Sequence, residues 1–261
     1  GQHDGGKSSD RCPLQQQIAG DLAAQLRSSM SSTEKQLVTK QGTQNPEAYD
    51  FYTKGRFAFN KRTPGDLQAG IWYFNQAIAK DPAYALAYSG LADVYSVMPS
   101  YGGVSSEDYP RSNTAARKAL ELDPSLAHPH AVLGASYMEY EWDFAAGEAE
   151  YKKAFDLDPN DPMALVWYAQ DVAQLGIDQE AGLAAANRAY QLDPLSPSVV
   201  FNVGHAQRLA GRFDDAIATC NKVVQENTYA RAHWCLTSAY WGKRDYVNAV
   251  RQWKLYAQLL G

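Results

Sequence analysis

A dipeptide, Asp-Pro, recurs along this chain at nearly constant intervals. Its prolines are separated by 42, 35 and 35 residues, at Pro82, Pro124, Pro159 and Pro194. An alanine stands five residues before each proline, at Ala77, Ala119, Ala154 and Ala189. Self-similarity at a period of roughly 20 to 50 residues is typical of stacked supersecondary units, because one unit cannot bury its apolar face alone. The chain is therefore predicted to be a stack of similar units.

The first half of each unit repeats as well. A bulky residue followed by a small one occurs in four units, at Leu91-Ala92, Leu133-Gly134, Tyr168-Ala169 and Val203-Gly204. Three residues later stands Tyr95, Tyr137 or Val172, and Gln207 is the departure. Small residues let the two helices of a hairpin approach closely, and aromatic side chains fill the spaces between hairpins.

Each unit is expected to end at its proline, because proline disfavours the helical region for the residue before it. A capping residue then opens the next helix, and Ser125 after Pro124 and Ser196 before Pro197 are the candidates. The run Asn45-Pro46-Glu47 reads as an N-cap, a proline at the first helical position and an acid that compensates the helix dipole.

Together these positions resemble the tetratricopeptide repeat, a two-helix unit with Trp/Leu-Gly/Tyr in one helix and Ala/Phe/Ala/Pro in the next. The resemblance covers roughly residues 45–261. It implies an all-α fold, a right-handed α-solenoid of about six helical hairpins preceded by an N-terminal amphipathic helix. The hairpins are predicted at residues 45–82, 83–124, 125–159, 160–194, 195–228 and 229–261. The second is the longest, and its extra residues are placed within 96–111 as a longer helix end and a loop.

The first 44 residues lie outside this repeat. Residues 1–13 are predicted to be a disordered segment without the apolar region of a signal peptide, and residues 14–44 to form linker helices. An apolar stripe with a spacing of four indicates an amphipathic helix; it consists of Leu14, Ile18, Leu22, Leu26 and Met30. This helix either packs on the first hairpin or belongs to a neighbouring domain or a dimer partner.

A narrower resemblance comes from four runs: 15–27, 45–49, 54–62 and 140–144. They are similar to bacterial signalling regulators in which tetratricopeptide repeats follow a TolB-like domain. Such regulators carry an N-terminal winged-helix, kinase or cyclase module, and no residue here matches those modules, so their activities do not carry over. The resemblance implies that the chain is the C-terminal portion of a larger regulator.

Composition narrows the classes of function. The net charge is -5, which gives no electrostatic footprint for nucleic acid. No run of 18 apolar residues occurs, so no direct membrane insertion is predicted. Three cysteines are too few and too odd in number for a disulfide framework, and Cys220 is interpreted as a buried free thiol at a core position.

Stacked hairpins leave their first helices lining a concave groove, which is the usual binding surface of such arrays. Arginine and aromatic side chains are the commonest anchors at interfaces. The predicted partner-binding residues are Tyr49, Tyr52, Arg56, Phe59, Asp93, His205, Arg208, Arg231, Trp234 and Trp241. The alternative is that the Tyr and Trp side chains only pack between hairpins. The Lys/Asn/Arg clamp by which some of these arrays grip a peptide carboxylate is not found at the aligned positions.

No catalytic residue, metal site or cofactor is predicted. His205, Cys220, His233 and Cys235 do not have the spacing of a closed zinc site. No Gly-rich phosphate loop, HExxH, GxSxG or CxxC motif occurs. The chain is therefore predicted not to be an enzyme, and an enzyme with an unrecognised site is the remote alternative.

The predicted function is a module that binds a peptide or protein segment in its groove. The alternative is homo-oligomerisation, as a homodimer through the Leu14–Met30 helix or the C-terminal helix. That last helix ends with apolar residues and is followed by no polar helix. The predicted compartment is the cytoplasm, and the alternative is an extracytoplasmic segment of a membrane-anchored regulator.

Overall fold

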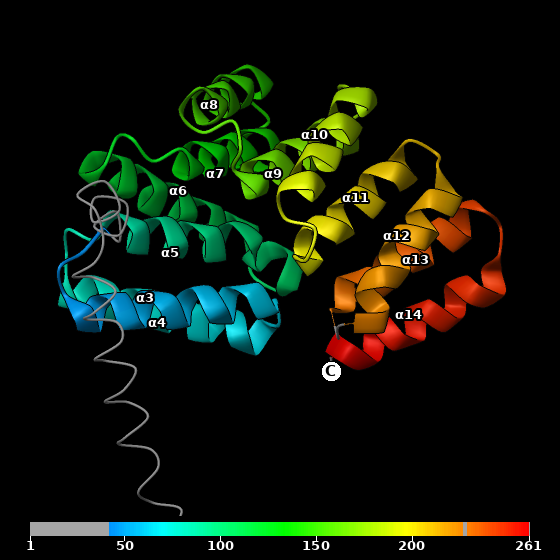
Figure 1. Ribbon diagram of the computed structural model, residues 1–261, viewed down its shortest axis with the longest axis horizontal. Helices are drawn as coiled ribbons and strands as arrows, with labels where there is room; N and C mark the ends of the chain where they lie inside the picture. Colours follow the sequence, from blue (N-terminus) through cyan, green and yellow to red (C-terminus); the bar gives the residue numbers. More distant parts are fainter. Residues whose placement is uncertain (1–41, 227–228, 261) are drawn as a thin grey trace, which may run out of the picture. The chain divides into compact units, whose positions relative to one another are not determined.

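The computed structural model of the protein describes residues 42–226 and 229–260, within which it contains helices and no strands. The predicted disordered segment 1–13 and the Leu14–Met30 helix lie outside the described residues. The helices follow one another in pairs, called hairpins one to six (Figure 1). The pairs are α3 (Pro46–Lys61) and α4 (Pro64–Lys80), α5 (Ala85–Val97) and α6 (Ser105–Leu122), α7 (His128–Ser136) and α8 (Phe144–Leu157), α9 (Pro162–Gln174) and α10 (Gln179–Leu192), α11 (Pro197–Leu209) and α12 (Phe213–Glu226), and α13 (Ala230–Gly242) and α14 (Tyr246–Leu260).

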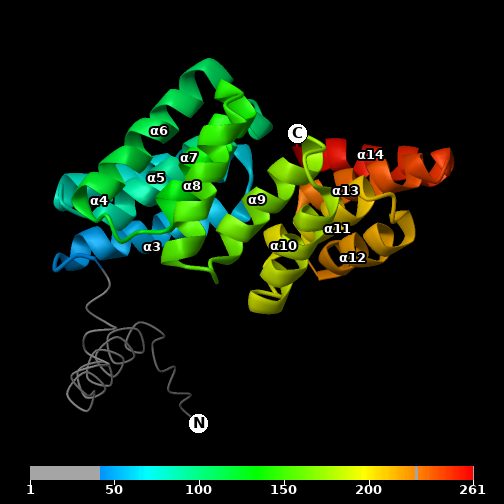
Figure 2. The same ribbon diagram turned by 90° about the horizontal axis from the view of Figure 1, so that it is seen from above.

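The hairpins stack in chain order. Within each hairpin the two helices pack against each other, and the first helix of each hairpin also contacts the first helix of the next. Helices α3, α5, α7, α9, α11 and α13 therefore form an inner layer, and their partners form an outer layer (Figures 1 and 2). This arrangement confirms the all-α solenoid that the sequence predicts.

The repeated Asp-Pro sites end the outer helices in the way the sequence predicts. Asp81, Asp123 and Asp158 are C-caps in extended conformation, with ψ between 94° and 96°. Asn45 caps α3 by accepting hydrogen bonds from the backbone of Glu47 (3.0 Å) and Ala48 (3.1 Å). These caps fix the helix ends at the predicted places.

One predicted cap is wrong. Ser196 does cap α11, accepting a hydrogen bond from the backbone N–H of Val199 at 3.4 Å. Ser125 caps no helix, because α7 begins only at His128 and its N-cap, Ala127, makes no side-chain hydrogen bond. Ser125 instead donates from its backbone and its hydroxyl to Asp123, at 2.9 and 2.6 Å. The serine closes the turn after α6.

Small residues stand where helices approach closely. A Cβ added at Gly55 would lie 2.7 Å from the Phe74 ring, and one added at Gly90 would lie 2.4 Å from it. Phe74 therefore fills the junction of the first two hairpins only because both neighbours lack a side chain. The alanines before the Asp-Pro sites, among them Ala154 and Ala189, are fully buried. The sequence pattern of small residues is thus a packing pattern.

Two inner helices end irregularly. After α5 the extra residues form a 3-10 helix (Met98–Tyr101) and a turn at Gly102, whose φ is 93°. α7 continues into a π-helical turn (Tyr137–Glu141), which ends at Trp142 in the left-handed region with φ 57°. Both irregular turns belong to inner helices, and π turns are frequent at functional sites.

A disulfide joins α12 to α13, so the interpretation of Cys220 as a free thiol is wrong. Cys220 and Cys235 are both fully buried, and their Cα atoms lie 6.5 Å apart. A Cβ at Gly204 would lie 2.3 Å from the sulfur of Cys220, so the glycine makes room for the bridge. The number of cysteines is a poor guide, because two of three cysteines can form a single bridge without a network of disulfides. The third cysteine, Cys12, lies outside the described residues.

Candidate functional site: the inner face of the array

A chain of charged side chains links hairpins one to four. Asp93 of α5, fully buried, accepts from the Arg56 guanidinium of α3 at 2.5 Å and contacts Nε2 of His128 at 2.7 Å. The other ring nitrogen of His128 lies 2.6 Å from the carboxylate of Asp161. Asp161 in turn caps α9, accepting from the backbone N–H groups of Met163 and Ala164. We call these four residues, Arg56, Asp93, His128 and Asp161, the charged chain.

The geometry requires the imidazolium form of His128, because both ring nitrogens face carboxylates and must donate. Burial alone would lower the pKa of His128, but Asp93 and Asp161 outweigh it and raise the pKa to about 10. Burial alone would raise the pKa of Asp161, but His128 and the backbone donors lower it to about 2. Burial likewise opposes ionisation of Asp93, and His128 and Arg56 nevertheless lower its pKa. The charged chain thus compensates its own buried charges.

A second polar cluster lies beside the charged chain, around the π-helical turn. Glu139 accepts from the hydroxyl of Tyr109 (2.6 Å) and from the amide of Gln170 (3.0 Å). Tyr151 donates to Asp171 at 2.5 Å, and burial together with the nearby Glu139 raises the pKa of Asp171. The neutral acid is therefore the favoured form of Asp171.

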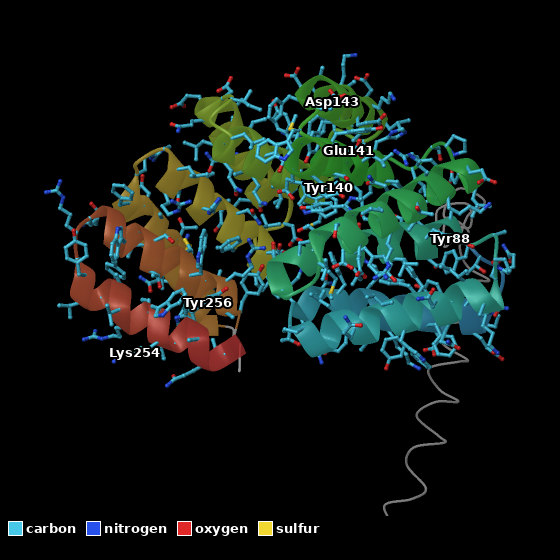
Figure 3. All side chains as sticks on the ribbon, turned by 180° about the vertical axis from the view of Figure 1, so that it is seen from behind. Tyr88, Tyr140, Glu141, Asp143, Lys254 and Tyr256 are labelled. Carbon is cyan, nitrogen blue, oxygen red and sulfur yellow. A yellow bond between two sulfur atoms is a disulfide. The ribbon has the colours of Figure 1, made fainter. Side chains whose placement is uncertain are left out.

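The end of the same turn packs against α6. Tyr140 stacks on Tyr109 with ring centroids 5.1 Å apart, and Glu141 accepts from the Asn113 amide at 3.2 Å (Figure 3). These contacts hold the turn in place, so that Glu139 stays beside the inner face.

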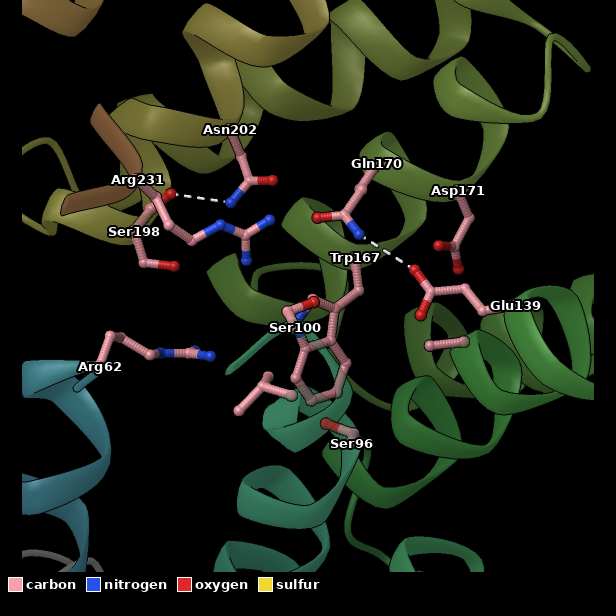
Figure 4. Close-up of a pocket in the computed structure, with 12 residues that line it drawn as sticks. Arg62, Ser96, Ser100, Glu139, Trp167, Gln170, Asp171, Ser198, Asn202 and Arg231 are labelled. Carbon is pink, nitrogen blue, oxygen red and sulfur yellow. Dashed lines mark hydrogen bonds between the residues drawn. The ribbon is translucent and has the colours of Figure 1, made fainter. Parts of the chain in front are cut away.

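A cavity of about 40 Å³ opens on the inner face (Figure 4). Residues from all six inner helices line it: α3 at its C-terminal end, α5, α7, α9, α11 and α13. The 3-10 helix after α5 and the π-helical turn after α7 also contribute. Its polar lining includes Arg62, Ser100, Glu139, Asp171, Asn202 and Arg231. Every inner helix thus contributes to one small polar space.

Neither arginine of this cavity forms an ion pair with an acidic side chain that the structure describes. Arg62 is 6% exposed, and its guanidinium stacks 3.9 Å from the centre of the Phe59 ring. Burial lowers the pKa of Arg62, yet an arginine keeps its charge in proteins. The Cζ atom of Arg231 lies 4.7 Å from the centre of the Phe201 ring and 6.0 Å from the centre of the Tyr101 ring. Both side chains point into the cavity (Figure 4).

The structure distributes the residues that the sequence predicts for partner binding. Arg56 and Asp93 are joined in the charged chain, Phe59 is 1% exposed in the core, and Tyr52 packs against Phe74 and Tyr84. Tyr49 and Trp241 are exposed, and the Trp241 ring contacts Tyr246. The role of these residues in binding a partner stays a prediction.

The remaining predicted residues gather on α11 and α13. His205 stacks on Phe201 and lies against Trp234, at centroid distances of 5.8 and 5.4 Å. Burial, with Arg208 and Arg231 nearby, lowers the pKa of His205 to about 3, so it is neutral. Arg208 donates to His205 Nδ1 at 3.4 Å and lies over the ring of Trp234. Arg231, by contrast, faces the cavity.

Sequence reasoning missed His128, Asp161 and Arg62. A signal existed for the first, because His128 and His130 flank a proline at a helix start. His130 contacts Glu150 at 2.6 Å, so both histidines are paired. Arg62 follows the first helix at a position outside the repeat pattern, and nothing in the sequence separates it from any other basic residue after a helix.

The described part of the chain holds neither a membrane span nor a metal cluster. None of its helices is long and apolar enough to cross a membrane. No group of three or more His, Cys, Asp or Glu side chains within it could hold a metal ion.

Comparison with known proteins identifies the repeat. Residues 143–197 and 183–231 match the tetratricopeptide repeat. No curated protein matches the chain by sequence. The solved structure of pilF from Pseudomonas aeruginosa is similar, with a TM-score of 0.52 and 24% identity over 69% of this chain and 78% of that one. The structure of PilW, a type IV pilus biogenesis factor, is similar with a TM-score of 0.51 and 18% identity, over 77% of this chain and 90% of that one.

A larger protein superposes more closely. The human IFIT1 dimer solved with m7Gppp-AAAA gives a TM-score of 0.66 at 16% identity, over 81% of this chain and 49% of that one. The chain thus spans about half the length of IFIT1. At these identities the likeness shows the fold alone. The tetratricopeptide repeat is thus matched over residues 143–231, and the other described hairpins share the same two-helix architecture.

Proposed function

We propose that the array is a non-enzymatic scaffold that binds a peptide or protein segment on its inner face. The observation that carries this proposal is the inner layer itself, in which the first helices of six consecutive hairpins contact one another in order and share one polar cavity. Extended concave surfaces of this kind are what solenoid proteins use for binding. Arg208 and the exposed Tyr49 and Trp241 supply anchors of the type that dominates interface energies.

Quantitative capture from a lysate of the source organism tests this proposal. The test variant is Tyr49→Ala/Arg208→Ala/Trp241→Ala, which spares the charged chain and the cavity. The matched control is Trp72→Ala, because Trp72 is 54% exposed but belongs to the outer helix α4. A partner kept by the wild type and the control but lost by the folded test variant supports inner-face binding. Equal capture by all three proteins would contradict it.

The wider setting is also part of the proposal. The resemblance to regulators with a TolB-like domain supports a place for this array in a larger bacterial signalling protein. The buried Cys220–Cys235 bridge supports an oxidising compartment, because disulfides persist there and are rare in the cytosol. We therefore favour an extracytoplasmic array over a cytoplasmic one. Mass analysis of cells lysed in denaturant with an alkylating reagent distinguishes the two, since Cys220 and Cys235 of a cytoplasmic array would be labelled and those of a disulfide-bonded array would not.

Homo-oligomerisation is the second candidate, and the last helix favours it. Helix α14 exposes apolar side chains on its outer side, including Val247 (73%) and Trp253 (51%). The ring of Trp253 lies 5.6 Å from that of Tyr256, which Figure 3 shows on this helix with Lys254. Sedimentation equilibrium at several concentrations tests this candidate. A concentration-dependent mass that Val247→Glu/Trp253→Glu abolishes supports a dimer through α14, and a constant monomer mass contradicts it.

A further inference from the structure

Two arginines line the cavity of the inner face without forming an ion pair with its acidic residues. Arg62 and Arg231 come from opposite ends of the array, from the end of α3 and from α13, and both face the cavity (Figure 4). Among the described side chains, neither arginine has an ion-pair partner. A buried cation without a counter-charge is costly. Such a site is therefore incomplete without an anion.

The acidic lining does not supply that counter-charge. Glu139 is already held by two donors, the Tyr109 hydroxyl and the Gln170 amide. The Asp171 carboxyl accepts from Tyr151, and burial favours its neutral form by raising its pKa. Both acids of the lining are thus engaged with donors other than the two arginines. An anion that enters the cavity would meet two guanidinium groups without an ion-pair partner.

The backbone conformation of Arg62 supports a functional role for its side chain. Arg62 is the C-cap of α3 in the left-handed region, with φ 56° and ψ 39°. Glycine, or sometimes asparagine, is the ordinary residue at such a helix end, because other side chains strain the left-handed backbone. Strain of this kind points to a functional role when the side chain is unpaired and aimed into a site.

The size of the cavity limits the anion. A space of about 40 Å³ is room for about three water-sized groups. That matches the three heavy atoms of a carboxylate, and it excludes a chain of phosphates. Ser100, from the residues inserted after α5, and Ser198 of α11 add hydroxyl donors to the lining. The inserted residues therefore help to build the wall.

We propose that this cavity binds a single carboxylate group of a protein or peptide segment between Arg62 and Arg231. The inference rests on the proposed function and names the chemistry of its partner. The carboxylate comes either from an acidic side chain or from a C-terminus. A planar carboxylate suits the arginine fork, which gives parallel, charge-assisted hydrogen bonds. The Oδ1 atom of Asn202, buried and without a donor among the described residues, is placed to accept an N–H of the same segment.

Fluorescence titration with three capped peptides tests the site. Acetyl-Gly-Gly-Gly carries only a C-terminal carboxylate, acetyl-Gly-Glu-Gly-amide only a side-chain carboxylate, and acetyl-Gly-Gln-Gly-amide no charge. Trp167 lines the cavity and serves as the reporter, and Trp167→Phe assigns the signal to it. The variants are Arg62→Asn, which tolerates the left-handed backbone, and Arg231→Gln. Arg212→Gln is the control, since Arg212 is an exposed arginine paired with Asp215.

We expect saturable binding of at least one carboxylate peptide and none of the neutral one. Each cavity variant should weaken binding by at least about tenfold, because a hydrogen bond to a charged group is lost, and the control should not. The stronger of the two acidic peptides identifies the source of the carboxylate. The proposal is overturned if neither acidic peptide binds, if both cavity variants bind as the wild type does, or if tripolyphosphate binds more tightly. Loss of peptide binding with partner capture intact would refute this site and leave inner-face binding standing.

Discussion

The two ends of the array hold their inner-face charges in different ways. In hairpins one to four, Arg56 and His128 are each paired with a buried or half-buried aspartate, and the pairs join into one chain. In hairpins five and six, Arg208 and Arg231 lie over the rings of Trp234 and Phe201 with no carboxylate partner among the described side chains, and Arg62 at the end of α3 in hairpin one lies over Phe59 in the same way. The strongest restraint there is a disulfide.

This difference separates side chains that hold the fold from side chains that are free for a ligand. A buried charge that is fully paired cannot be spared for binding, because removing either partner leaves the other charge uncompensated. A cation that rests on an aromatic ring keeps its donors for another group. An arginine on an inner helix is therefore not by itself a predicted binding residue. The prediction depends on whether its guanidinium is already paired with a carboxylate.

The largest effect is expected at the centre of the charged chain. Asp93→Ala leaves Arg56 without its carboxylate and removes one of the two carboxylates that His128 contacts, and it should lower the free energy of unfolding by about 3–5 kcal/mol. Chemical denaturation measures the loss. Asp214→Ala is the control, because it breaks an exposed pair with Lys243 and should cost less than about 1 kcal/mol. Equal losses in the two variants would contradict the structural role of Asp93.

The same chain predicts a pH dependence. The pKa of His128 is raised from its ordinary value of 6.5 to about 10, so its contribution is complete below pH 6.5 and lost as the pH rises toward 10. We expect the free energy of unfolding to fall by a few kcal/mol across that range. Denaturation at several pH values should show a flatter curve for His128→Gln. Parallel curves for the two proteins would show that His128 titrates alike in both states.

The disulfide should matter next, and only locally. Cys220→Ala/Cys235→Ala removes a bridge between residues 15 apart, which is worth about 3 kcal/mol. Hydrogen exchange should become faster in hairpins five and six and change little in α3 and α4. Uniformly faster exchange would mean that the whole array unfolds as one unit. A second readout is the thiol count, since the intact denatured chain should show one free thiol, Cys12.

The smallest effect concerns packing. Ala189 is fully buried on α10, so Ala189→Leu should cost about 1–3 kcal/mol by overpacking. The matched control is Ala184→Leu on the exposed side of the same helix, which should be nearly neutral. Thermal unfolding of the two variants decides the point, and an unchanged melting temperature for Ala189→Leu would mean that the site can expand without strain.

The sequence predicts the repeating part of this molecule well, because period, small residues and Asp-Pro stops are local signals. Ala154 and Asp158 behave as their pattern implies. The site is less predictable, because its members meet only after the hairpins stack. Arg62 and Arg231 are 169 positions apart (231 minus 62), and no local pattern relates them. The pairing of Arg56 with Asp93 is hidden for the same reason, although both residues were assigned to the inner face.

The distinction between fold-holding and ligand-holding charges is tested most directly by two variants measured side by side, Asp93→Asn and Arg62→Asn. For each, the free energy of unfolding and the affinity for the stronger acidic peptide are determined on the full chain. We predict a large loss of stability for Asp93→Asn. For Arg62→Asn we predict unchanged or higher stability, because asparagine suits the left-handed backbone, together with at least about tenfold weaker peptide binding. An Arg62→Asn protein that is as unstable as Asp93→Asn yet binds the peptide normally would contradict the account.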